Sequence, residues 1–473
     1  MSAALWTPAE AAAAMGAAAR GPIGAPIGGI SIDTRTLQPG DLFFAIKGEA
    51  SDGHAYVERA FEAGAACAVV ERAKAAPYSD RYALFPVEDT LRAMEKLGVA
   101  ARARSKARII AVTGSVGKTS AKEMLRVALG AAGPTHAAAA SYNNHWGVPL
   151  TLARMPAEAA FGVFEIGMNH AGEITPLVGL VRPHAALVTT IAPVHIEYLG
   201  SLEAIAEAKA EIFTGLQPEG AAILPADAPH FDLLRRRAAA AGAQISTFGA
   251  APDADARLLS VTPQDGGSRV EARIFGRDLA FRLGAPGLHM AQNALGVLIA
   301  ADALGVDIAT TAEALAAFAP AKGRGERLIL RAKDGPFTLI DESYNANPVS
   351  TRAALDLLGA TAPERGGRRV AALGDMLELG PDGPAMHTAL AEDLTRNRVD
   401  LLFCAGPLMR GLYDAAPARM RGAWGAKSAD IEKPLFEALR GGDVVMVKGS
   451  NGSRMGPVVA ALKSNFSGDA SAA

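Results

Sequence analysis

The chain has 473 residues, of which 50% are hydrophobic and 20% charged, with a formal net charge of −2. This length favours two to four domains, because a single core rarely grows past about 250 residues. The composition excludes a disordered protein, and the charge gives no support to nucleic-acid binding through a general basic surface. Cys67 and Cys404 lack CxxC spacing, which argues against disulfides or a zinc site and favours a reducing cytoplasm.

The alanine-rich N-terminus does not have the pattern of a secretory signal. It lacks a basic leading segment, and Thr7-Pro8-Ala9-Glu10 instead predicts the N-cap, first position and acidic first turn of a helix. No stretch approaches the roughly 20 strongly apolar residues that a membrane span needs. The sequence therefore predicts a soluble, cytoplasmic protein that does not insert into membranes.

Residues 1–107 predict a small α/β unit that precedes any nucleotide motif. The expected elements are strands at 30–33, 41–46 and 66–70 and a helix at 56–64. Polar loops, Asp33-Thr34-Arg35 and Lys47-Gly48, follow the first two strands. Such loops either bind a second ligand or form plain turns, and the residues alone leave both interpretations open.

A strand, a glycine loop and a helix follow one another at residues 108–129. The apolar strand ends at Thr113, the loop is Gly114-Ser-Val-Gly117, and Lys118-Thr119 open the helix. This arrangement is typical of phosphate binding, with backbone N–H groups and the helix N-terminus facing the anion, the lysine reaching the terminal phosphates and the threonine hydroxyl available to Mg²⁺. Val112 stands where the general motif has glycine, so a tight structural turn is the alternative.

Residues 108–319 alternate strands and helices, which predicts a mostly parallel sheet covered on both faces. Further strands are expected at 161–166, 185–190 and 221–224. Ligands of such sheets lie beyond the carboxyl ends of the strands, where Glu165 and His195 stand. Both could ligate a divalent ion held by a triphosphate. The alternative is that the carboxylate caps a loop and the imidazole lies at the surface.

The helix predicted at 202–213 places a lysine on its apolar face. Lys209 falls in the stripe formed by Leu202, Ile205, Ile212 and Phe213, whereas Glu203, Glu207 and Glu211 share another, solvated face. A buried lysine has a depressed pKa and a reactive neutral amine. The alternative is a lysine that packs its stem and extends its ammonium to water.

The remaining chain predicts a β-rich appendage at 244–283, a helix from Gly287 with His289 and Asn293 one turn apart, and a domain boundary near residue 320. The helix pair could contact a base edge or only stabilise the helix entrance. Beyond the boundary, strands at 337–340, 369–373, 401–404 and 443–447 each end in a polar or glycine-rich loop. This repetition favours a nucleotide-binding type of α/β domain, although any such domain has turns there.

Taken together, these segments resemble the Mur ligases of bacterial cell-wall synthesis over nearly the whole chain. The family's phosphate loop has the form T-G-S/T-x-G-K-T/S, which accounts for Val112. Within the family, the closest resemblance is to the members that add D-alanyl-D-alanine to UDP-N-acetylmuramoyl-tripeptide. The segments that carry it are Asp33-Thr-Arg, Lys47-Gly-Glu, Asn143-Asn144 with Gly147-Val-Pro-Leu-Thr, Glu165-Ile-Gly with Asn169-His170, Ala208-Lys-Ala-Glu-Ile-Phe213, Asp341-Glu-Ser-Tyr-Asn-Ala-Asn347, Gly374-Asp-Met-Leu-Glu-Leu-Gly380 and Val447-Lys-Gly-Ser450.

The resemblance implies an α/β protein of three domains: a UDP-muramoyl-substrate domain at 1–107, a central P-loop domain at 108–319 and a Rossmann-like dipeptide domain at 320–473. It implies ATP, two Mg²⁺ ions and a carbamylated lysine at Lys209. Lys118, Lys209, His195 and Arg324 would be catalytic, and Thr119, Glu165, His195 and Lys209 would bind metal. The nucleotide would contact Thr113, Gly114, Ser115, Val116, Gly117, Lys118, Thr119, Ser120, His289, Asn293, Arg324 and Asp341. The small-molecule substrates would contact Ser31, Asp33, Thr34, Arg35, Lys47, Asn143, Asn144, Tyr344 and Asn345.

The sequence departs from the family at a few positions. Val116 stands where serine or asparagine is common, and Asp341-Glu342 where two aspartates often occur. The alternatives are the sister ligase that adds diaminopimelate or lysine, whose typical Asp-Asn-Pro-Arg is missing here, a P-loop ATPase switch and an inactive nucleotide-binding scaffold. The resemblance further implies a monomer.

Overall fold

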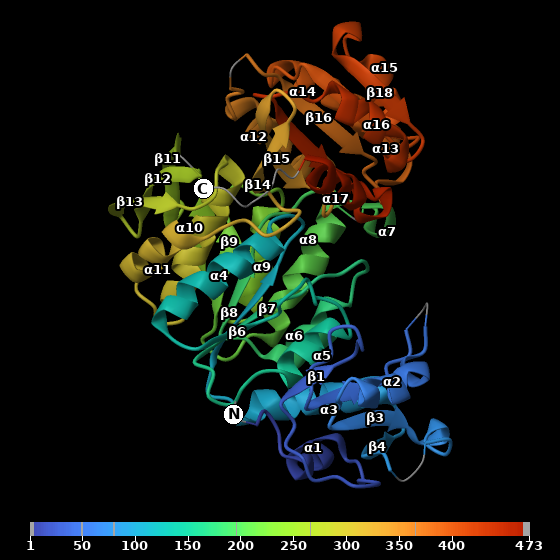
Figure 1. Cartoon of the computed structure of the whole chain (residues 1–473). Helices are drawn as coiled ribbons and strands as arrows, with labels where there is room; N and C mark the ends of the chain where they lie inside the picture. The colour runs from blue at the N-terminus through green and yellow to red at the C-terminus, as the bar shows by residue number, and fades with distance from the viewer. Residues whose placement is uncertain are drawn as a thin grey trace.

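The computed structural model describes residues 4–48, 51–78, 81–194, 196–264, 266–364 and 366–466. Three sheets follow one another along the chain. Figure 1 shows them as three bodies, with the N-terminal one at the bottom, the P-loop body in the middle and the C-terminal one at the top. The predicted α/β class with mostly parallel sheets is confirmed. The boundaries at 107/108 and 319/320 stay predictions, and each sheet falls inside one predicted domain.

The first sheet has four parallel strands in sequence order. They are β1 (Gly29–Ser31), β2 (Asp41–Phe44), β3 (Cys67–Glu71) and β4 (Leu84–Val87). The helices are α1 (Pro8–Met15), α2 (Val57–Glu62) and α3 (Thr90–Arg104), the last of which the sequence did not predict. The Thr7 capping box that starts α1 is formed as expected, with the hydroxyl accepting from the Glu10 N–H and the Glu10 carboxylate accepting in return.

The central sheet has nine strands in the order β13-β12-β11-β10-β9-β8-β5-β7-β6. Their bounds are β5 (Arg108–Thr113), β6 (Thr135–Ala137), β7 (Phe161–Glu165), β8 (Ala185–Val188), β9 (Ala221–Pro225), β10 (Gln244–Gly249), β11 (Ala256–Gln264), β12 (Gly267–Ile274) and β13 (Arg277–Leu283). Helices cover both faces: α4 (Lys118–Ala132), α5 (Gly147–Ala153), α6 (Ile174–Val181), α7 (Ile196–Leu199), α8 (Leu202–Ala210), α9 (Phe231–Ala240), α10 (Leu288–Ala303) and α11 (Ile308–Ala314).

The strands at 244–283 are not an appendage, which corrects the expectation from their turn signals. β10 pairs in parallel with β9 over five residues, and β11 to β13 continue the same sheet as an antiparallel meander. The inward residues Val270, Ala272 and Ile274 are buried in one core with α4 and α10. The turns lie where the sequence predicted them, but turn residues do not indicate that β10 pairs with β9 of the central sheet.

The C-terminal sheet has the order β14-β15-β19-β16-β17-β18, with only β14 antiparallel. Its strands are β14 (Glu326–Ala332), β15 (Gly335–Glu342), β16 (Arg369–Gly374), β17 (Leu401–Ala405), β18 (Arg421–Gly425) and β19 (Val444–Lys448). Its helices are α12 (Pro348–Ala360), α13 (Gly383–Thr388), α14 (Leu390–Arg396), α15 (Met409–Ala415), α16 (Ser428–Ala438) and α17 (Met455–Phe466). Separate apolar cores lie on the two faces of this sheet.

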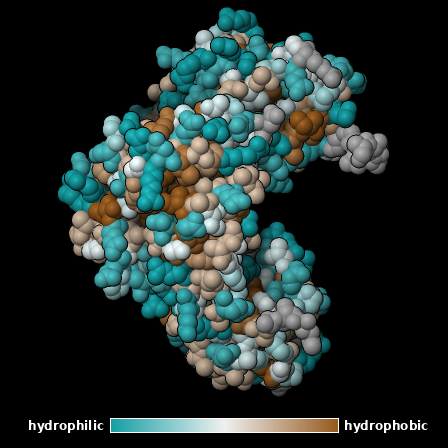
Figure 2. Space-filling view, turned by 90° about the vertical axis from the view of Figure 1, so that its left-hand side faces the viewer, coloured by the Kyte–Doolittle hydropathy of each residue, from teal (hydrophilic) through white to brown (hydrophobic). Residues whose placement is uncertain are grey.

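The three bodies differ in how they meet. Helix α3 packs on α5 so closely that a Cβ at Gly98 would lie 3.1 Å from Leu152, and Leu150 and Ala153 of α5 belong to the core of the first domain. In the space-filling view, a broad notch separates the lower from the upper part of the molecule (Figure 2). The first and central domains are therefore joined by a shared core, and the notch opens between the first and third domains.

Candidate active site

The glycine loop after β5 has a backbone that only glycine accepts at two positions. Gly114 and Gly117 have φ values of 140° and 89°. A Cβ at Gly114 would collide with the Thr189 hydroxyl, and one at Gly117 would lie 2.7 Å from the Asn293 amide nitrogen. Both glycines therefore let β8 and α10 approach the loop, whose backbone is left to face a ligand.

Hydrogen bonds hold this loop to the end of the neighbouring strand β8. The Ser115 N–H donates to the Thr190 carbonyl at 2.9 Å, and the Ser115 hydroxyl donates to the Ala192 carbonyl at 3.0 Å. The Thr189 hydroxyl donates to the Val116 carbonyl at 2.6 Å. The loop is thus fixed before any phosphate arrives, so binding need not pay for ordering it.

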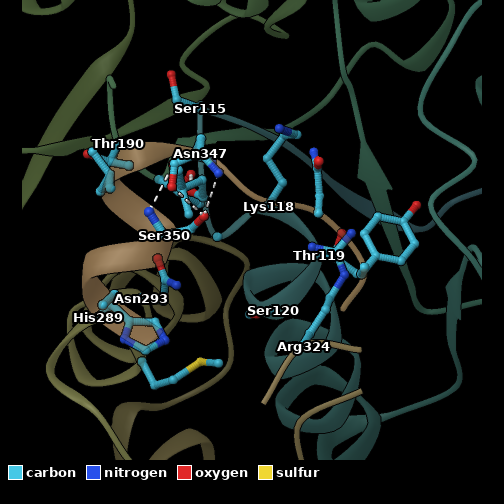
Figure 3. A pocket seen from close by; sticks show the side chains of 18 of the residues that line it. Ser115, Lys118, Thr119, Ser120, Thr190, His289, Asn293, Arg324, Asn347 and Ser350 are labelled. Atoms are coloured by element: carbon cyan, nitrogen blue, oxygen red, sulfur yellow. Dashed lines mark hydrogen bonds between the residues drawn. The ribbon is translucent and has the colours of Figure 1, made fainter. Parts of the chain in front are cut away.

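A cavity of about 570 Å³ opens beside the loop, between the central and third domains. Figure 3 shows Lys118, Thr119 and Arg324 on one side of it and His289 and Asn293 of α10 on another. Thirteen of the predicted site residues line the cavity. They are Ser115, Val116, Gly117, Lys118, Thr119, Ser120, Asn143, Glu165, His289, Asn293, Arg324, Tyr344 and Asn345.

Oxygen ligands suited to Mg²⁺ meet at the carboxyl end of β7. The Thr119 hydroxyl lies 3.0 Å from one oxygen of the buried Glu165 carboxylate, and the Asn143 amide donates to the other at 2.7 Å. A hydroxyl and a carboxylate are hard donors, and Mg²⁺ commonly takes only one or two protein ligands beside phosphate. The donor set therefore fits that ion. Within the described residues, no group of three or more His, Cys, Asp or Glu side chains comes together as a metal site.

Lys118 begins α4 and donates from its ammonium to the Gly114 carbonyl at 2.7 Å. Burial lowers the pKa of this lysine, and the Glu165 carboxylate partly offsets the effect. The ammonium therefore lies folded back over the loop on the wall of the cavity, where incoming phosphate oxygens would replace the carbonyl as its partner.

Lys209 lies at the end of α8, and its predicted inward position is confirmed because only 1% of the residue is exposed. The alternative, an ammonium extended to water, is excluded. Burial holds the pKa of Lys209 well below its usual range, and the Lys118 charge adds to the effect. Of the two alternatives that the helical spacing left open, the structure bears out the buried lysine with a depressed pKa.

The prediction that Glu211 is a solvated residue is wrong. The helix predicted to 213 ends at Ala210, and Glu211 begins a 3₁₀ turn (Glu211–Gly215) that brings its carboxylate to the N-terminus of α6. There it accepts from the N–H groups of Gly172, Ile174 and Thr175 at 2.6–3.1 Å. These donors have no partner within the helix, so the carboxylate completes the start of α6.

The third domain reaches the phosphate side of the cavity through one arginine. Arg324 Nη2 lies 3.3 Å from the hydroxyl of Ser141, which in turn lies 3.3 Å from the Thr119 hydroxyl. The guanidinium also stacks over the Tyr344 ring, with its carbon 3.9 Å from the ring centroid. This contact places a cation from the third domain beside the phosphate loop.

The opposite end of the cavity is suited to an aromatic base. His289 and Asn293 lie one turn apart on α10, and burial lowers the pKa of His289, so the imidazole is neutral near pH 7. Asn293 also packs against Gly117 of the phosphate loop. The sequence left open whether His289 and Asn293 contact a base or only stabilise the start of the helix. In the structure, both side chains lie in the first turns of α10 and face the cavity.

Several predicted contacts do not lie on the cavity wall. Thr113 is buried with its hydroxyl on the Ile166 carbonyl, and the Asn144 amide oxygen accepts from the Gly147 N–H at the start of α5. Asp341 is 1% exposed and accepts from Ser343, whereas Glu342 lines the cavity. Gly114 and Lys209 also lie off this wall, and His195 lies outside the described residues.

The predicted substrate residues of the first domain lie apart from this cavity, at the carboxyl edge of β1 and β2. The Asp33 carboxylate and the exposed Arg35 form an ion pair at 2.6 Å, which lowers the pKa of Asp33. The Ser31 hydroxyl donates to the Asp33 carbonyl, and Lys47 is exposed beyond the second strand. With Thr34 in the same loop, these five residues form one polar edge, because β1 and β2 are parallel.

Ser141 and Lys448 line the cavity wall but were not among the predicted site residues. Ser141 links Thr119 to Arg324. Lys448, at the end of β19, is 2% exposed and donates to the Asn345 carbonyl at 2.9 Å and to Glu342 at 3.4 Å. In the sequence, Lys448 was part of the Val447-Lys-Gly-Ser450 segment of the resemblance, without a predicted role of its own. The described residues include no helix long and apolar enough to cross a membrane.

Comparison with known proteins finds three family models that match segments between residues 26 and 451. Residues 26–128 match the Mur ligase family catalytic domain, residues 112–301 the Mur ligase middle domain, and residues 323–451 the "Mur ligase, glutamate ligase domain". The UDP-N-acetylmuramoyl-tripeptide--D-alanyl-D-alanine ligase of Bacillus subtilis is 34% identical over 92% of each chain.

Solved structures agree with this assignment. A crystal structure of MurF from Acinetobacter baumannii has a TM-score of 0.82 and 29% identity over 97% of this chain and 99% of that one. MurF from Thermotoga maritima in complex with ADP has a TM-score of 0.74 and 25% identity over 92% of this chain and 97% of that one. The chain therefore belongs to the Mur ligase family.

Proposed function

We infer that the chain is the ATP-dependent ligase that joins D-alanyl-D-alanine to UDP-N-acetylmuramoyl-tripeptide, giving the pentapeptide precursor of peptidoglycan. The observation that carries this inference is the similarity over 92% of both chains to relatives of that name. The geometry agrees with this inference, because residues of the third domain line the cavity beside the phosphate loop of the central domain.

The reaction has two steps. The terminal carboxylate of the tripeptide attacks the γ-phosphorus of ATP and gives an acyl phosphate and ADP. The free amine of D-alanyl-D-alanine then attacks the acyl carbon, phosphate leaves, and the amine loses a proton to complete the amide. Both steps bring anions together, so the site must neutralise charge and exclude the water that would hydrolyse the acyl phosphate.

The residues around the glycine loop divide this work. Lys118 and the backbone of residues 115–120 hold the phosphates, and Arg324 brings a second cation from the third domain. Thr119 and Glu165 would hold Mg²⁺, which when bound neutralises phosphate charge and orients the oxygens. His289 and Asn293 contact the base, and Glu342, which lines the cavity, is better placed than Asp341 to meet the sugar.

Lys209 carries a carbamate in this proposal. Its neutral amine attacks the carbon of CO₂, an amine proton leaves to water, and the resulting carbamate has two oxygens that share one negative charge. The proposal is supported by burial and by the strongly lowered pKa of Lys209 beside the Lys118 ammonium. Together with His195, the carbamate would hold a second Mg²⁺ ion.

The muramoyl substrate spans the first and central domains in this proposal. Its uridine end would meet the polar edge formed by Ser31, Asp33, Thr34, Arg35 and Lys47. Asn143 would face the peptide near Glu165, and Tyr344 and Asn345 would meet the dipeptide from the third domain. We propose that the enzyme is a monomer. We also propose that it works in the cytoplasm, in line with the free thiols of the buried Cys67 and Cys404.

The test is ADP release measured with each substrate left out in turn. We expect release only when UDP-muramoyl-tripeptide and D-alanyl-D-alanine are both present, with the pentapeptide found by mass spectrometry. Extension of the UDP-muramoyl-dipeptide by diaminopimelate or lysine would identify the sister ligase instead. Hydrolysis of ATP without the muramoyl peptide would identify an ATPase switch.

A further inference from the structure

A second lysine on the phosphate-loop helix is buried without facing the cavity. Lys122 lies one turn after Lys118 on α4, and its side chain is 1% exposed. Its ammonium lies 2.8 Å from the Ala138 carbonyl, 3.4 Å from the Ala140 carbonyl and 2.8 Å from the Glu123 carboxylate. Three N–H donors thus meet three oxygens, which is what a buried ammonium requires.

The two carbonyls belong to a segment whose first residues have only small apolar side chains. Residues 137–140 are four alanines, and residues 138–146 form neither helix nor strand. Alanine offers no polar group and little surface for packing, so backbone contacts must position this stretch. The Lys122 ammonium supplies donors to two of its carbonyls from the body of α4.

The same segment delivers two side chains to the reaction centre. Ser141 contacts both the Thr119 hydroxyl and Arg324, and Asn143 donates to Glu165. The Asn143 carbonyl also accepts from the Gly167 N–H at 2.8 Å, directly after β7. Residues 138–143 therefore touch the predicted metal ligands and the one arginine that the third domain inserts.

We propose that Lys122 is a positioning residue: by binding the 138 and 140 carbonyls it sets Ser141 and Asn143 against Thr119, Glu165 and Arg324. The inference deepens the proposed function and rests on it for the catalytic consequence. Lys122 itself does not line the cavity, so it acts only through this segment. Losing its ammonium would let the segment shift and would weaken the contacts on which nucleotide binding and entry of Arg324 depend.

The first test compares Lys122→Met with Arg126→Met. Arg126 lies one turn later on the same helix and also pairs with Glu123, at 2.7 Å, but it does not contact residues 138–140. Calorimetry with Mg·ADP should give a dissociation constant about tenfold higher for Lys122→Met and one within twofold of wild type for Arg126→Met. The kcat for ADP release should fall by a similar factor in Lys122→Met only.

Three outcomes decide the proposal. A folded Lys122→Met protein with wild-type affinity for Mg·ADP and wild-type kcat overturns it. If that variant does not fold, Lys122→Gln, which keeps two N–H donors on a shorter and uncharged side chain, replaces it under the same criterion. In the double variant Lys122→Met/Ser141→Ala, the losses should be less than additive because Lys122 acts through the segment that bears Ser141, and full additivity would contradict the proposal.

The binding measurement separates this proposal from the proposed function. Mg·ADP affinity depends on the phosphate loop and not on the peptide substrates. If the wild-type protein released no ADP with tripeptide and dipeptide, the ligase assignment would fail, while the comparison of Lys122→Met with Arg126→Met would still decide the role of Lys122.

Discussion

The second turn of α4 and the end of α8 each bury a lysine near the phosphate loop, and the surroundings of the two are opposite. Lys122 meets two carbonyls and a carboxylate. Lys209 is equally buried, but no oxygen of the described residues accepts from it, and its pKa is held far below the usual range by burial. Lys122 therefore ties backbone carbonyls to α4, whereas the surroundings of Lys209 supply no such partner and favour its neutral amine.

Replacing the unsatisfied lysine should have the largest effect. We expect Lys209→Ala to lower kcat for ADP release by at least about 1,000-fold, since the carbamate oxygens that position the second metal would be lost. Short carboxylic acids such as acetate should restore part of the activity by filling the space. Glu207→Ala on the same helix, whose carboxylate binds Arg237 at the surface, is the control. Full activity of Lys209→Ala without added acid would refute the carbamate.

The two lysines should affect stability with opposite signs. Lys122→Met leaves the Ala138 carbonyl without its donor and removes one of two partners from both the Ala140 carbonyl and Glu123, so it should lower the free energy of unfolding by about 2 kcal/mol. Lys209→Met removes an amine that must give up its proton on folding and should raise the free energy of unfolding by about 1 kcal/mol. Urea unfolding of both variants beside wild type checks this. A loss of stability in both variants would show that the two surroundings are energetically alike.

The pH dependence of stability should reveal the lowered pKa of Lys209 directly. In the folded protein this lysine is neutral at a pH where the unfolded chain still holds its proton, up to about 10.5. Because the unfolded state then binds more protons, stability rises with pH through that window, by at most about 1.4 kcal/mol per pH unit. The measurement is the difference in unfolding free energy between wild type and Lys209→Met in CO₂-free buffer. A flat difference below pH 10.5 would mean an unshifted pKa.

The difference between Lys122 and Lys209 also shows which features could be predicted from the sequence. The phosphate loop was predictable because strand, glycines and helix follow one another locally, and the inward position of Lys209 followed from helical spacing. The contacts of Lys122 could not be predicted, because its carbonyl partners lie 16 and 18 residues away in an alanine stretch without any pattern.

Asp341 and Glu342, at the end of β15, show a second limit of prediction from the sequence. Asp341 was chosen as the nucleotide contact, yet Glu342 is the one that lines the cavity. Successive side chains of a strand point to opposite faces, and β15 ends at Glu342. Which of two adjacent carboxylates faces the ligand depends on the packing of the sheet, and here the buried Asp341 is bound to Ser343.

The smallest effect should come from the carboxylate that follows Lys209. Glu211→Gln keeps one oxygen acceptor at the start of α6 but removes the charge that faces its N–H groups. We expect a loss of about 1 kcal/mol in the free energy of unfolding, as for other helix starts, and a kcat reduced far less than in Lys209→Ala. Glu203→Gln, on the exposed face of α8, should change neither. If Glu211→Gln were as inactive as Lys209→Ala, the end of α8 would act as one catalytic unit, and its lysine could no longer be treated as the only reactive group there.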